Sequence, residues 1–157
     1  MSAAYFLRFK FESGHYALAG KEQLGGREVL RIEYYPARLF ADREDHADHE
    51  KHDDGDERFD RQMNKVSLVT LWILRDERQI VRYVFDNVDM AFLPGRSLLR
   101  VDGLTASMKM AEPFPGVWLP QAIEGHVRFG TAAGSVAAAY DIAYVDYKLA
   151  GVTVKVR

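Results

Sequence analysis

The sequence predicts a mainly β fold: a single, strongly curved antiparallel sheet of about eight strands. Apolar and polar residues alternate with period two through most of the 157 residues, as they do in half-buried strands. Turn signals separate these runs at short intervals, which favours a meander in which consecutive strands pair through tight turns. Because long aromatic-rich strands need one face covered, we expect the sheet to bend into a half-barrel.

The elements of the first third are three strands. They are expected over Tyr5–Glu12, Tyr16–Glu22 and Val29–Tyr35. Ser13-Gly14 and Gly25-Gly26 supply the turns between them. Pro36 ends the third strand, because proline cannot donate a hydrogen bond to the ladder.

The rest of the chain repeats this pattern after a charged segment. Further strands are expected over Val66–Leu74, Gln79–Phe85, Leu98–Lys109, Trp118–Phe129 and Val136–Tyr147. The breaks between them fall at Arg75–Arg78, Leu93–Arg96, Pro113–Gly116 and Thr131–Gly134. Each connection is short, so neighbouring strands are expected to pair.

The charged segment, residues 41–62, is an acidic, histidine-containing insert. It holds ten acidic and four basic residues, which gives it a charge of −6, while the remainder carries +4. Within the insert at 41–65 we expect one short helix, because Phe59 and Met63 are four residues apart on an otherwise charged stretch that continues to Val66. Phe59 and Met63 would form a lid on the open face of the sheet.

Composition bounds the class of protein. The length fits one domain over residues 1–157. The absence of cysteine excludes disulfides, thiolate metal sites and cysteine nucleophiles. No apolar run reaches the length of a transmembrane segment, and the charge balance is too weak to indicate nucleic-acid binding. The chain has no signal-peptide anatomy, so it is either cytoplasmic or a fragment of a longer exported protein. Because it begins abruptly in a strand pattern, we expect the fragment.

Three segments, taken in order, resemble one bacterial family. Tyr16–Glu33 has a strand that reaches Gly-Lys-Glu, a Gly-Gly-Arg turn and a returning strand. Thr70–Arg82 joins Trp-Ile to Ile-Val-Arg through an acidic turn. Gly116–Lys148 begins with Gly-Val-Trp-Leu-Pro and ends in Tyr-Val-Asp-Tyr-Lys. In this order the segments, spanning roughly residues 15–148, resemble the bacterial outer-membrane lipoprotein-carrier and lipoprotein-sorting superfamily.

That resemblance implies a half-barrel whose apolar concave face holds acyl chains beneath a helical lid. It also implies a periplasmic location in the bacterial envelope, with a signal peptide outside the present sequence. Other envelope proteins are possible partners. Neither a cofactor nor an enzymatic activity is implied.

Three histidines, His46, His49 and His52, raise the question of a metal site in the insert. Imidazole suits zinc or nickel, and histidines three apart on a helix could share one ion. The alternative is a solvated polar loop rich in like charges, since the segment has almost no apolar anchors. We favour the polar loop and predict no metal site.

Catalytic motifs are absent from the sequence. It contains no nucleophile elbow, zinc-protease helix, phosphate-binding loop or dinucleotide fingerprint. Glu124, His126 and Arg128 alternate along one expected strand, and Asp141 lies on the next. They would form either a charged cluster or, as we favour, an outward-facing polar row. We therefore expect a protein that is not an enzyme.

The apolar stripe is the main functional lead. Eleven residues are expected to line the concave face, namely Phe9, Phe11, Leu18, Ile32, Leu71, Ile73, Tyr83, Phe85, Leu104, Met108 and Met110. They would bind a hydrophobic ligand or a lipoprotein acyl chain, to whose shape methionine adapts. Alternatively, they simply form the core. The competing function is a structural or protein-interaction domain of a larger envelope protein, without a small-molecule ligand.

Overall fold

The computed structural model of the chain describes residues 3–11, 13–37, 67–87, 99–131 and 134–151. These residues form seven antiparallel strands in one open sheet and one short helix, which confirms the predicted mainly β architecture. The helix is α1 (Ala3–Arg8). The strands are β1 (Gly14–Leu24), β2 (Arg27–Pro36), β3 (Ser67–Leu74), β4 (Gln79–Asn87), β5 (Leu99–Phe114), β6 (Val117–Thr131) and β7 (Gly134–Ala143).

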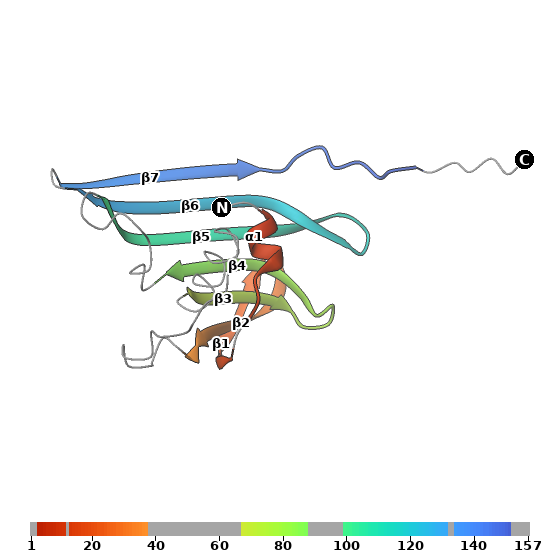
Figure 1. The fold of residues 1–157 in the computed structure, drawn as a ribbon. Helices are drawn as coiled ribbons and strands as arrows, with labels where there is room; N and C mark the ends of the chain where they lie inside the picture. Colours follow the sequence, from red (N-terminus) through yellow and green to blue (C-terminus); the bar gives the residue numbers. More distant parts are fainter. Residues whose placement is uncertain (1–2, 12, 38–66, 88–98, 132–133, 152–157) are drawn as a thin grey trace, which may run out of the picture.

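The strand order in the sheet, β1 to β7, is the order of the chain. Figure 1 shows this meander, with β1 and β7 at its two edges and α1 lying across one face. The sheet does not close on itself, and the architecture is half-barrel-like, as predicted. No pair of neighbouring strands therefore requires a crossover connection.

Glycines fix two of the tight turns. Gly25 and Gly26, between β1 and β2, have φ values of 59° and 78°. Gly116, between β5 and β6, has a φ of 74°. This left-handed region carries no Cβ penalty for glycine, and both turns lie where the sequence predicts them.

The N-terminal segment is the main departure from the prediction. The prediction of a strand over Tyr5–Glu12 is wrong, because Ala3–Arg8 forms α1 instead. Ala3, Phe6 and Phe9 are three residues apart and all pack against the core, which is the spacing of one helical face. The helix takes the place of one expected strand, which leaves seven in the described part of the chain.

Side chains alternate between two faces of the sheet, and we call the face against which α1 packs the inner face. Two rows of paired residues cross it from β1 to β7. The aromatic row consists of Tyr16, Tyr34, Val69, Phe85, Ala106, Gly125 and Tyr140. The aliphatic row consists of Leu18, Ile32, Leu71, Tyr83, Met108, Ile123 and Ile142.

The core lies where the middle of these rows meets α1. Val69, Phe85 and Met108 are 0% exposed. Exposure rises toward both edges of the sheet, to 67% at Leu18 and 36% at Ile142. The inner face is therefore buried at its centre and open at its two ends.

Several predicted features lie outside the described residues. They are the helix of the 41–65 insert, the lid residues Phe59 and Met63, and the histidines His46, His49 and His52. Within the ranges that are described, no helix has the length and hydrophobicity needed to cross a membrane. The same ranges hold no group of three or more histidine, aspartate or glutamate side chains arranged to bind a metal ion.

Candidate functional site

The inner face carries the candidate site, because strand pairing gathers most of the predicted binding residues there. Five of the eleven belong to the aliphatic row, namely Leu18, Ile32, Leu71, Tyr83 and Met108. Phe85 belongs to the aromatic row. On the neighbouring positions of the same face, Ile73 is paired with Leu30, and Leu104 with Val127.

These predicted residues differ in exposure. Leu71, Tyr83, Phe85 and Met108 are buried, Phe9, Ile32, Ile73, Leu104 and Met110 are partly buried, and Phe11 and Leu18 are exposed. The buried members pack on one another and on α1. Their contact with a ligand stays a prediction, and a ligand could reach them only if α1 moved.

The cover of the inner face is α1, and two phenylalanines hold it there. Phe6 is only 2% exposed, and its ring centroid lies 5.0 Å from that of Phe85 and 6.3 Å from that of Tyr83. The Phe9 ring, just after the helix, lies 4.8 Å from Phe85. All three contacts are edge-to-face, the geometry that aromatic quadrupoles favour.

An aromatic cluster lines the inner face beside β1. The Tyr34 ring lies 5.1 Å from Phe11 and 5.0 Å from Tyr16. Tyr34 is fully buried, but Phe11 is 37% and Tyr16 58% exposed. The cluster therefore leads from the surface at the β1 edge to the buried centre of the aromatic row.

Sequence reasoning missed two residues that shape this face. Phe6 is not among the predicted binding residues, although its spacing from Phe9 fits one face of a helix. Tyr140 covers Gly125, where a Cβ would lie 2.1 Å from the tyrosine ring. No sequence signal reveals this approach, because it depends on the pairing register of β6 and β7. The Tyr140 hydroxyl is buried and has no hydrogen-bond partner among the described residues, and burial raises its pKa.

The opposite, outer face carries a polar ladder. Trp72 Nε1 donates to one carboxylate oxygen of Glu22 at 2.7 Å, and Arg31 donates to the other at 2.8 Å. The Arg82 guanidinium lies 4.7 Å from the centroid of the Trp72 ring. The Trp72 hydrogen bond is the largest cause of a lowered pKa at Glu22, and Arg31 adds to it against the opposing effect of burial.

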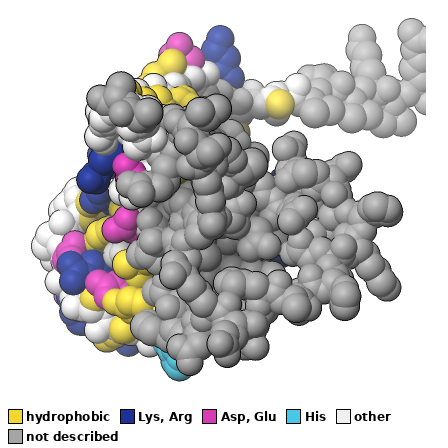
Figure 2. Space-filling model, turned by 60° about the vertical axis from the view of Figure 1, so that its left-hand side comes forward, with side chains coloured by type: hydrophobic (Ala, Val, Ile, Leu, Met, Phe, Trp, Pro, Cys, Tyr) yellow, Lys and Arg dark blue, Asp and Glu magenta, His cyan; other side chains and the backbone are white. Residues whose placement is uncertain are grey.

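The ladder continues onto β5 and β6. Lys109 Nζ donates to Glu124 at 3.1 Å and lowers the pKa of that carboxyl. Asp141 is paired with Glu124 across the two strands, so the charged residues of these strands form an outer polar row. On the described surface in view in Figure 2, acidic and basic side chains are interspersed with hydrophobic ones.

We expect the protein to lose stability as the pH falls below the ordinary glutamate pKa of 4.5. A carboxyl whose pKa is lower in the folded state stabilises that state above the unfolded pKa, and this contribution is lost as the pH falls through the folded pKa. Urea unfolding should be compared for wild type and Trp72→Phe at about pH 7 and about pH 3. The variant should be less stable at the higher pH, by a margin that shrinks at the lower. A margin that does not change with pH would contradict the role assigned to the Glu22 carboxylate.

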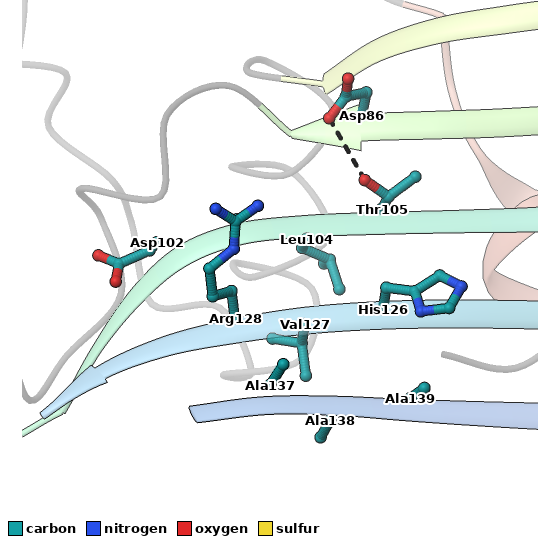
Figure 3. Close-up of a pocket in the computed structure, with 11 residues that line it drawn as sticks. Asp86, Asp102, Leu104, Thr105, His126, Val127, Arg128, Ala137, Ala138 and Ala139 are labelled. Atoms are coloured by element: carbon teal, nitrogen blue, oxygen red, sulfur yellow. Dashed lines mark hydrogen bonds between the residues drawn. The ribbon is translucent and has the colours of Figure 1, made fainter. Parts of the chain in front are cut away.

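A hollow of about 460 Å³ lies over β4 to β7, and Figure 3 shows its lining. Asp86, Thr105 and His126 form one cross-strand row in it, and the Thr105 hydroxyl lies 3.5 Å from an Asp86 oxygen. Arg128 reaches from β6 across β5. Asp102 adds a second carboxylate, and all these side chains are exposed. The hollow therefore presents mixed charge and no buried polar group, which makes the inner face the stronger candidate.

Comparison of the chain with protein-family models, with curated proteins and with solved structures gives no match. The function is therefore argued from the geometry of the inner face.

Proposed function

We propose that this chain is a non-enzymatic binding module of the bacterial envelope, which holds a lipid or a lipoprotein acyl chain on its inner face. The observation that carries the proposal is the pair of apolar rows that cross all seven strands, on which one short helix packs in the described part of the chain. The resemblance of the strand motifs to lipoprotein carriers points the same way. In this proposal α1 is displaced when the ligand enters.

The side-chain contacts of α1 contribute less free energy than the burial of a long acyl chain would. Helix α1 has six residues, too few to be stable alone, so its position depends on its side-chain contacts. Burying one phenylalanine such as Phe6 is worth about 1.5–3 kcal/mol, whereas each acyl methylene contributes about 0.8 kcal/mol. About two to four methylenes therefore match the contact of Phe6, and a longer chain has free energy left to offset the cost of association.

The rows also offer a path and a polar contact. Phe11 and Tyr16 expose the β1 end of the aromatic row, where a chain could enter. Met108 and Met110 lie on β5, four strands away from this end of the row, and can adapt to the shape of a ligand. The buried Tyr140 hydroxyl could donate a hydrogen bond to the carboxylate or ester of an amphiphile.

The proposal is tested by titrating the protein with a fluorescent fatty acid. Wild type is expected to bind the probe, with the increase in emission that accompanies transfer into an apolar site. Phe6→Ala is expected to bind it several-fold more tightly, because a weakened cover increases the population of the open, binding-competent state.

Leu7→Ala is the matched control, since Leu7 lies on the same helix but is 54% exposed. It should bind the probe as wild type does. Circular dichroism would establish that each variant keeps its sheet. If neither wild type nor a folded Phe6→Ala variant takes up the probe at any concentration below its micelle threshold, the proposal is wrong.

A second candidate function is a structural or protein-interaction domain of a larger envelope protein. The observation that favours it is the exposed apolar surface along and beyond β7. Val136 is 55% exposed, and Val145 and Leu149, in the segment after the strand, are 72% and 71% exposed. Native mass spectrometry of the purified chain distinguishes the candidates, because only the first predicts a co-purifying or added acyl ligand.

A further inference from the structure

The edge formed by β7 is an unpaired strand edge within the described part of the chain. Figure 1 shows β7 along the border of the sheet, with β6 on one side. The two strands pair over ten consecutive residues, from Gly134 to Ala143, without a bulge. Nine of those ten residues are exposed, so the strand is straight, regular and accessible along its length.

The backbone groups that β7 directs outward can be identified from one hydrogen bond. The Tyr144 N–H, just after the strand, donates to the Gln121 carbonyl of β6 at 2.9 Å. In an antiparallel ladder alternate residues turn both backbone groups toward the partner strand. Because the register has no bulge, the even-numbered residues face β6. The odd-numbered residues direct their N–H and C=O groups away from it, and these are Ser135, Ala137, Ala139, Asp141 and Ala143.

The opposite edge, β1, has protection that β7 lacks. Its ladder is interrupted by a bulge between Leu18 and Gly20, and it carries the charged residues Lys21 and Glu22. Bulges and edge lysines are the features that keep natural sheets from pairing edge to edge. In β7 the one charged residue is Asp141, and proline and lysine are absent. Of the two edges, β7 is the one open to strand addition.

We propose that β7 pairs antiparallel with β7 of a second copy of this chain, about a two-fold axis at Ala138. This register places Ala137 opposite the second copy's Ala139, so the outward backbone groups meet in hydrogen-bonded pairs. It places Asp141 opposite Ser135, whose hydroxyl now donates to the Phe129 carbonyl at 3.3 Å and can rotate to donate to the carboxylate instead. A parallel in-register arrangement would instead set the two Asp141 carboxylates side by side, which is unfavourable.

The same register joins the inner faces of the two copies. Val136 comes opposite Tyr140, and an aromatic residue beside a β-branched one is a favourable cross-strand pair. Val136 is 55% exposed before pairing. The arrangement is isologous and leaves the protected β1 edges at the outside, so assembly stops at two copies. It does not depend on the proposed acyl ligand, which would lie under α1 on each copy.

A single pair of strands makes a small interface, below about 1,200 Å², and such interfaces are weak. We therefore expect a dimer that dissociates on dilution. Sedimentation velocity over a concentration series should show a monomer and a dimer in exchange. Ala139→Pro removes an outward N–H without touching the hydrogen bonds to β6, and it should abolish the dimer. Ala139→Val keeps the N–H and should retain it.

Cysteine substitution tests the register, because the sequence has no cysteine of its own. In the Ala138→Cys variant, the new side chain would lie at the two-fold axis, opposite the same position of the second copy. This is a non-hydrogen-bonded pair with Cα atoms about 4.5 Å apart, a distance that a disulfide can bridge. It should form a covalent dimer on mild oxidation, while Ala137→Cys, which faces Ala139, should not.

A chain that stays monomeric at every concentration, or a dimer that survives in Ala139→Pro, would overturn the inference. Acyl-probe binding by a monomer would leave the proposed function standing, so the two ideas fail separately.

Discussion

Phe85→Ala is expected to lower the free energy of unfolding by about 3–5 kcal/mol. Phe85 is 0% exposed in the middle of the sheet, and its ring contacts both Phe6 and Phe9. Removing it leaves a cavity between β4 and α1 and takes away the surface against which the helix rests. Since a domain of this size has a total stability of about 5–15 kcal/mol, the loss would be a large fraction of it.

The measurement is urea unfolding followed by circular dichroism and tryptophan fluorescence. Val84→Ala is the matched control, because Val84 precedes Phe85 on the same strand but lies on the outer face and is partly buried. It should cost about 1 kcal/mol. If the two variants lost the same amount, the burial of Phe85 beneath α1 would not be the source of the effect.

Gly14→Ala is expected to cost about 1–3 kcal/mol, although it adds only one methyl group. A Cβ at this position would lie 2.4 Å from the Tyr35 carbonyl oxygen and 2.8 Å from the Tyr34 ring. The carbonyl belongs to the backbone of β2 and cannot swing aside, and the ring is fully buried. The strand start or the tyrosine must therefore shift.

Gly103→Ala is the control for this substitution. Its Cβ would meet only the end of the Arg128 guanidinium, at 3.9 Å, which is an ordinary contact. Because alanine also restricts the unfolded chain, this variant should be neutral or more stable by up to about 1 kcal/mol. Thermal and urea unfolding of the two proteins side by side tests the difference. A Gly14→Ala protein as stable as Gly103→Ala would mean that β1 does not approach Tyr34 as described.

The strands could be predicted from the sequence because two independent signals agree on them. Alternation marked each strand, and glycine or proline marked the turns, as at Gly25–Gly26 and Pro113–Gly116. The prediction of a strand in the N-terminal segment was wrong for a physical reason. Its apolar residues fit either a two-residue or a three-residue spacing, and a short apolar run cannot distinguish a strand from one and a half turns of helix.

The candidate site was predictable in kind but not in detail. The apolar stripe of each single strand is visible in the sequence, so Leu71, Tyr83 and Met108 could be predicted to share one face of the sheet. Their pairing into one row depends on register, and the sheet shifts register at bulges such as Trp72/Ile73 and Lys109/Met110, which leave no simple sequence signature. Residues whose role comes from a neighbouring element, such as Phe6 over Phe85, could not be identified without the fold.

The order of the strands has a consequence for how the molecule assembles. Because each strand meets the one that follows it in the chain, the sheet can grow by adding one hairpin arm at a time. The entropy of closing a loop is small for most steps and grows only slowly with the longer connections. Among all-β proteins this chain is therefore expected to have a low contact order and to acquire its native topology comparatively fast.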